Sequence, residues 1–143
     1  MSVRLRVAAI ILDGDRVFLV STRKGAPGYF VPPGGTWEEG ETVREALARE
    51  VEEEAGLRVE VLHLLAYREL WRAGRQALEL FFSARLPANN QPTQGVHREG
   101  RDFKWVSVRD LSGVPHFPER LAELCGIVLA GQPGVLDLGV VRF

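Results

Sequence analysis

This chain of 143 residues has little cysteine, no excess of basic charge and no long apolar run. The one cysteine, Cys125, cannot form an internal disulfide, and we therefore expect a reducing compartment and a cytoplasmic protein. No apolar run approaches the ~18 residues that a membrane-spanning helix requires, so we expect no membrane partner. The formal net charge is -1, which offers no basic excess for binding a nucleic-acid polymer.

What is present is the composition of one globular domain. Hydrophobic residues make up 45% and charged residues 26% of the chain, and its length suits one core but not two. We therefore expect a single domain over 1–143. The first 14 residues combine basic residues with an apolar stretch, as a signal peptide does, but they lack a small-residue cleavage site and run into a turn. A strand is the favoured interpretation.

Apolar patterning predicts both strands and helices along the chain. The expected strands are 3–12, 16–22, 29–31, 58–70, 76–86 and 103–108, and the expected helices are 43–55 and 118–130. Asp13-Gly14-Asp15 is typical of a hairpin turn. A second turn is expected at 72–75, although helix formers in 64–80 leave a helical alternative open. The tail after Gly131 is either a further strand or a packed extension.

The helix at 43–55 has the clearest boundaries. Thr42 followed by Glu45 predicts a capping box at its start, and Gly56 predicts its end. For the helix at 118–130, Pro118 is expected in the first turn, and Cys125 lies on an apolar stripe, which predicts a buried and unreactive thiol.

Eight glutamates and two arginines occur between Glu38 and Glu54. At ~100° per residue, three of the glutamates continue the apolar stripe of the helix, while Glu45 and Glu52 lie opposite. The three on the stripe are Glu50, Glu53 and Glu54.

Carboxylates that face the body of a protein together repel one another, and Arg49 supplies only one adjacent positive charge. A hard divalent cation is the economical solution, because such ions prefer oxygen ligands. The three histidines (63, 97 and 116) are dispersed and offer no zinc set. Just upstream, Gly34 and Gly35 allow close approach of the backbone to a ligand. Together these features predict a site for a phosphate and a metal ion.

At this point the chain resembles a known family. Gly35, Glu41 and the segment REVEEEAGL at 49–57 match every specified position of the Nudix box, G-x5-E-x7-R-E-U-x-E-E-x-G-U with U aliphatic. The lead-in FVPPGG at 30–35 and the segment FKWVSVRDL at 103–111 also resemble the family, so the resemblance covers about 3–130.

The resemblance implies the Nudix fold, an α/β/α sandwich with a mixed, partly antiparallel sheet. It also implies a Mg²⁺- or Mn²⁺-dependent pyrophosphohydrolase, in which water attacks phosphorus of a nucleoside diphosphate linked to another group. By motif match, the metal ligands are Glu50, Glu53 and Glu54, and Glu41 is either a further ligand through water or a partner of Arg49. Arg49 would orient these carboxylates, and Gly35 would allow the loop to pack on the helix. Glu41 has an equal alternative as a favourable acid at a helix start.

The catalytic base and the substrate contacts are less defined. The base is either a box glutamate, Glu50 or Glu53, or Glu99 in the polar loop 87–101. Arg23, Gly34 and Gly35 are candidates for substrate binding. Three aromatic residues could stack a nucleobase, but packing is the commoner role; they are Tyr29, Trp37 and Trp71.

The particular substrate stays open, because the residues typical of three Nudix branches are missing. Nucleoside di- or triphosphates and nucleotide sugars both fit. A non-catalytic nucleotide sensor of the same fold is the main alternative, although it would typically lose box glutamates. An isoprenoid diphosphate isomerase is a further alternative, but it needs a cysteine in its pocket. A homodimer is also open, since many relatives pair through strands.

Overall fold

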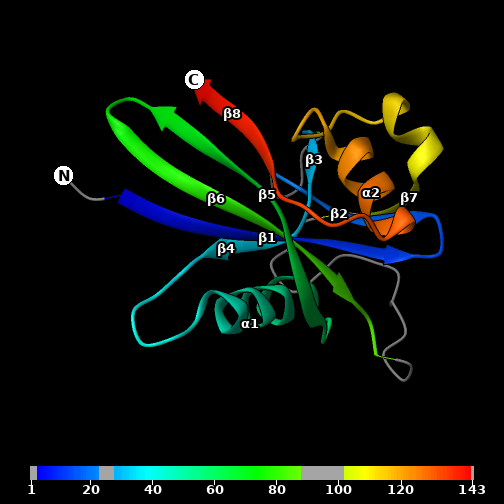
Figure 1. The fold of residues 1–143 in the computed structure, drawn as a ribbon, viewed down its shortest axis with the longest axis horizontal. Helices are drawn as coiled ribbons and strands as arrows, with labels where there is room; N and C mark the ends of the chain where they lie inside the picture. The colour runs from blue at the N-terminus through cyan, green and yellow to red at the C-terminus, as the bar shows by residue number, and fades with distance from the viewer. Residues whose placement is uncertain (1–2, 23–27, 88–101, 143) are drawn as a thin grey trace.

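A mixed sheet lies between two helices in the computed structural model, which describes residues 3–22, 28–87 and 102–142 (Figure 1). The strands are β1 (Val3–Asp13), β2 (Arg16–Ser21), β3 (Phe30–Val31), β4 (Gly34–Thr36), β5 (Glu60–Arg72), β6 (Arg75–Arg85), β7 (Phe103–Ser107) and β8 (Leu136–Arg142). The helices are α1 (Val43–Ala55), the 3-10 turn η1 (Val108–Gly113) and α2 (Leu121–Ala130). Arg23, His97, Glu99 and most of the polar loop fall outside the described residues.

The strand order across the sheet is β3-β2-β1-β6-β5-β8, with β4 also paired to β1 and β7 to β2. The pairs β1–β6 and β5–β8 are parallel, and the other pairs are antiparallel. This mixed, partly antiparallel sheet confirms the expected α/β fold class.

Alternation along β1 explains why both faces of the sheet are covered. Val7, Ala9 and Ile11 pack in one apolar cluster with α1, while Ala8 and Ile10 pack in a second cluster with α2. Successive side chains of a strand point to opposite faces, so this one buried strand serves two cores. Figure 1 shows α1 and α2 on opposite sides of the sheet, which confirms the α/β/α sandwich.

The structure confirms the predicted bounds of α1. The Thr42 side chain accepts a hydrogen bond from the Glu45 amide, and the Glu45 carboxylate accepts one from the Thr42 amide. Gly56 ends the helix with φ 69°.

Both predicted hairpins also form. The β5–β6 hairpin turns at Ala73 and Gly74, which both have positive φ, and the helical alternative for this region is wrong because cross-strand pairing overrides local helix propensity.

Two expectations need correction. The second helix begins at Leu121 and not at 118, because the Leu121 amide bonds to the Pro118 carbonyl in a separate turn. Gly34 and Gly35 fall outside the predicted strands, but with Thr36 they form β4 on β1. The tail forms a strand, β8, parallel to β5, which confirms one of its two alternatives. Among the described residues, no helix is both long and apolar enough to span a membrane.

Candidate active site

Arg49 is the centre of an ionic cluster on α1. Its Nε and Nη2 donate to the two carboxylate oxygens of Glu41 at 3.0 and 2.8 Å. Its Nη1 donates to Glu50 at 3.0 Å and to Glu53 at 3.3 Å. Nη2 also reaches the Thr36 carbonyl at 3.3 Å, which ties the helix to β4. One guanidinium therefore gathers three carboxylates that the sequence pattern singled out.

The three stripe glutamates are not equally screened from water. Glu54 is buried, with 6% of its surface exposed, and the Glu50 side chain is 20% exposed. The Glu53 side chain is 57% exposed, so the expectation that it is also screened is wrong. Glu53 lies at the flank of the stripe and accepts the i,i+4 hydrogen bond from Arg49 at the surface. Glu52 is exposed, as expected.

The environment of the cluster shifts the pKa values of Glu41 and Glu50 in opposite directions. Hydrogen bonds from Arg49 hold the pKa of Glu41 below its ordinary value. Burial raises the pKa of Glu50, and the hydrogen bond from Arg49 only partly opposes that effect. The same bonds raise the pKa of Arg49 further above its ordinary value. Arg49 is therefore a permanent cation, and Glu50 holds a proton more readily than Glu41 does.

Gly34 and Gly35 each leave no room for a side chain, but for different steric reasons. A Cβ on Gly35 would lie 2.2 Å from the Glu50 carboxyl carbon, so the missing side chain makes room for that carboxylate. A Cβ on Gly34 would lie 2.0 Å from the Val7 carbonyl oxygen, so here glycine permits close strand pairing. Gly35 thus allows the loop to pack on the helix.

The donor set has the chemistry for a hard divalent ion but not, in this structure, its geometry. Among the described residues, no three acidic, histidine or cysteine side chains lie together in a way that could hold one ion. The available donors are nevertheless all carboxylate oxygens, and Arg49 neutralises only part of their charge. Such oxygen donors are those that Mg²⁺ and Mn²⁺ prefer. The residues therefore fit the cation, provided that side chains now bonded to Arg49 turn toward it.

A cavity of about 470 Å³ lies beside β4. Gly34 lines it, together with residues of β1, β3, β5 and β6. Its floor contains a buried glutamate, Glu79, between Arg6 and Arg68. These three residues pair across the strands in register, Arg6 with Glu79 and Arg68 with Glu79. The sequence analysis missed them; charged residues within otherwise apolar strands were the available signal.

The three aromatic candidates for base stacking differ in their contacts and in their exposure. Trp37 packs in the α1 cluster and donates from Nε1 to the Glu41 carbonyl at 2.6 Å, so it supports the loop before the helix. Trp71 lies under the Arg142 guanidinium. Tyr29 is 40% exposed, stacks edge-on against Phe117 and lines the cavity, which leaves it accessible to a ligand.

The lone cysteine, Cys125, lies on α2 and is buried, as predicted. Cys125 has no exposed surface, and burial raises the pKa of its thiol to about 12. A thiol that keeps its proton in an apolar core is a poor nucleophile. His116 bonds through Nδ1 to the Val114 carbonyl at 2.7 Å, and His63 is exposed on β5, so neither histidine adjoins the carboxylate cluster.

Comparison with known proteins identifies the family of this chain. Residues 3–124 match the family model of the NUDIX domain, and the chain therefore belongs to the Nudix hydrolase family. Nudix hydrolase 10 of Arabidopsis thaliana is 29% identical over 112 residues, which are 78% of this chain and 40% of that protein. An 8-oxo-dGDP phosphatase of Mus musculus is 34% identical over 97 residues, which are 67% of this chain and 27% of that protein. The chain spans less than half the length of these curated relatives.

Solved structures show the same fold. A NUDIX hydrolase from Nitrosomonas europaea superposes with a TM-score of 0.74 at 23% identity, covering 98% of this chain and 79% of the other. A UDP-X diphosphatase superposes with a TM-score of 0.73 at 23% identity, covering 96% of this chain and 68% of the other. At these identities the likeness establishes the architecture alone.

Proposed function

We propose that this chain is a Mg²⁺- or Mn²⁺-dependent pyrophosphohydrolase that cleaves a nucleoside diphosphate linked to another group. The observation that carries this proposal is the cluster in which Arg49 bonds Glu41, Glu50 and Glu53 next to Gly35. Nucleoside di- or triphosphates and nucleotide sugars are the substrate classes. An 8-oxo-dGDP phosphatase and an ADP-ribose pyrophosphatase among the matched relatives support the choice of reaction.

The metal ion would be held by carboxylates of the box. Glu50, Glu53 and Glu54 are the proposed direct ligands, and Glu41 contributes directly or through water. A bound divalent ion neutralises phosphate charge and lowers the pKa of a coordinated water. The excess of carboxylate charge around Arg49 provides the attraction for it.

The remaining work falls to the chain's own residues. Arg49 orients Glu41, Glu50 and Glu53 through the bonds described above. A carboxylate then accepts the proton of the attacking water; the candidates are the Oε atoms of Glu50 and Glu53, and Glu99, which lies outside the described residues. Gly34, which lines the neighbouring cavity, and Gly35 are proposed backbone contacts for the phosphates. Arg23, also outside the described residues, is the proposed side-chain contact.

The test is a hydrolysis panel with a matched pair of variants. The full chain is incubated with Mg²⁺ and a range of nucleotides, and released phosphate or nucleoside monophosphate is measured. Glu53→Gln is expected to lower kcat by about 10²- to 10³-fold, as loss of a principal electrostatic group does. Glu52→Gln, one residue away but exposed on the opposite side of α1, is expected to keep the activity.

Two other outcomes correspond to the alternatives. Inactivity on the whole panel, with nucleotide binding that is indifferent to Glu53→Gln, would replace the hydrolase by a non-catalytic sensor. An isomerase of isoprenoid diphosphates is disfavoured by a direct observation, because Cys125 is a buried core residue of α2 and lines neither of the two cavities described.

A further inference from the structure

We propose that the cavity beside Gly34 binds a second phosphate of the substrate, one that is not part of the scissile anhydride. The inference rests on the proposed function for the anhydride itself. It narrows the substrate to diphosphate anhydrides that carry an additional phosphate monoester.

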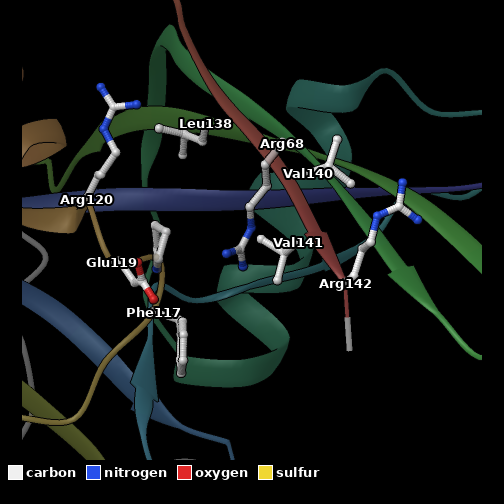
Figure 2. A pocket seen from close by; sticks show the side chains of 9 residues that line it. Arg68, Phe117, Glu119, Arg120, Leu138, Val140, Val141 and Arg142 are labelled. Carbon is white, nitrogen blue, oxygen red and sulfur yellow. The ribbon is translucent and has the colours of Figure 1, made fainter.

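The position of the cavity allows one molecule to reach both sites. Gly35 lies against Glu50 in the carboxylate cluster, and its neighbour Gly34 lines the cavity. A substrate with its anhydride at the box carboxylates can therefore place its remaining part in this cavity. A second cavity of about 370 Å³ shares Arg68, Phe117 and Pro118 with the first. Figure 2 shows the Arg68 side chain between residues of β8 and the segment before α2.

The cavity floor holds two guanidiniums in place with one carboxylate. Glu79 accepts from Arg68 Nε at 2.8 Å and from Arg6 Nε at 3.4 Å. The side chains of Glu79 and Arg68 are only 8% and 12% exposed, and Arg6 is 40% exposed. Both arginines thus donate to Glu79 through Nε. Within the described residues, their terminal Nη groups make no hydrogen bond. These Nη groups are the donors available to a ligand.

The charge of the lining is unbalanced. Glu79 is the one acidic residue that lines the cavity in the described part of the chain, and it offsets one of two guanidiniums. Arg4 and Arg75 also line the cavity, and neither forms an ion pair with a described residue. The lining therefore carries an excess of positive charge, which favours the binding of an anion.

A phosphate fits this lining better than the edge of a nucleobase. Each oxygen of Glu79 already accepts a hydrogen bond from an arginine, so the donors at the cavity floor outnumber the remaining acceptors. A phosphate monoester accepts through three oxygens and matches the planar fork of arginine. Arg68 is also fixed by the Phe81 ring beneath it, at 5.5 Å, so little rotational freedom is lost when it binds.

The experiment compares substrates that differ by one phosphate. Hydrolysis of NADPH is measured against NADH, and of coenzyme A against 3′-dephospho-coenzyme A, in the presence of Mg²⁺. We expect kcat/KM to be about ten-fold or more higher for the phosphorylated member of each pair, the size of effect that a charge-assisted hydrogen bond produces. Binding of adenosine 2′,5′-bisphosphate and of 5′-AMP is measured by calorimetry without metal as a readout that needs no hydrolysis.

Two variants connect the preference to the cavity. Arg6→Gln removes one guanidinium and keeps the Arg68–Glu79 pair, and it is expected to lower the preference toward one. The paired change Arg68→Met with Glu79→Met removes the buried charges together and guards against misfolding from an uncompensated carboxylate. Arg16→Gln is the control, since Arg16 forms an exposed ion pair with Asp13 and does not line the cavity.

The outcomes separate the two proposals. Hydrolysis of both members at equal kcat/KM, or an equal loss on both in Arg6→Gln, would overturn the phosphate site and leave the hydrolase standing. No hydrolysis of these pairs or of the nucleotide panel, combined with tighter binding of the bisphosphate that Arg6→Gln abolishes, would support the phosphate site and refute the hydrolase. Equal binding of the two nucleotides, with no hydrolysis of the pairs or of the panel, would refute both.

Discussion

Arg49 donates two hydrogen bonds to Glu41, from Nε at 3.0 Å and from Nη2 at 2.8 Å. Glu41 lies in the loop before α1, and Arg49 lies on the helix. The pair therefore fixes the loop that follows β4 against the helix that carries the other carboxylates. Trp37 Nε1 adds a bond to the Glu41 carbonyl at 2.6 Å, so the same loop is held from a second direction.

Replacing Arg49 with lysine should keep the charge and lose this geometry. Lysine cannot donate to Glu41 through a planar fork and bond Glu50 at the same time. We expect Arg49→Lys to lower kcat by about 10- to 100-fold, the effect of one or two charge-assisted hydrogen bonds. Steady-state kinetics measure it, and Arg58→Lys, at a side chain that is 81% exposed, serves as the control. An unchanged kcat in Arg49→Lys would show that charge alone suffices.

Adding a methyl group at Gly35 should disturb the site directly. A Cβ there would meet the Glu50 carboxyl group at 2.2 Å, so the carboxylate or β4 must shift. We expect Gly35→Ala to lose most Mg²⁺-dependent hydrolysis, measured over a range of Mg²⁺ concentrations. Gly126→Ala is the matched control, because nothing lies within 4 Å of its added Cβ. Alanine inside a helix should raise the free energy of unfolding by about 0.5–1 kcal/mol there.

Removing the N-cap of α1 should weaken the fold at the helix that carries the site. Thr42→Ala deletes the side-chain acceptor of the Glu45 amide. We expect a loss of about 1 kcal/mol in the free energy of unfolding, measured by chemical denaturation. Thr42→Ser retains the hydroxyl and should stay close to the original stability. Equal losses in both variants would contradict a role for the cap.

The buried thiol should be inert while the protein is folded. Because burial raises the pKa of Cys125 to about 12, the folded chain keeps this proton where an exposed thiol, with its value of 9.0, ionises. The unfolded chain binds fewer protons between these two values, so Cys125 makes unfolding more favourable as the pH rises through that range. Labelling with a thiol reagent at pH 8 should be slow in buffer and fast in denaturant. Rapid labelling of the folded chain would refute the burial.

Removing divalent ions should abolish activity reversibly. The carboxylates around Arg49 retain an excess of negative charge, which a hard cation offsets. We expect EDTA to stop hydrolysis, and Mg²⁺ or Mn²⁺ to restore it. The ions should also raise the Tm, because a ligand that binds only the folded state stabilises that state. Full activity in EDTA would rule out the metal-dependent mechanism.

The local features of this protein were readable from the sequence. The capping box at Thr42, the stop at Gly56 and the apolar period of α1 depend on residues within a few positions of one another, and the structure confirms their bounds. The spacing of Gly35, Glu41 and Arg49 identified the family for the same reason. Helical periodicity also placed Glu50 and Glu54 toward the body of the protein correctly. It misjudged Glu53, because periodicity does not show how far the protein covers the flank of the stripe.

Only the tertiary structure decided which distant segments meet. The alignment of Arg6, Glu79 and Arg68 depends on the register of three strands, and no local pattern specifies that register. The choice of a strand for the tail depends likewise on an available edge of β5. The residues of α1 set out the carboxylates by themselves, whereas the arginine-lined cavity beside them exists because long-range pairing brings three separate strands together.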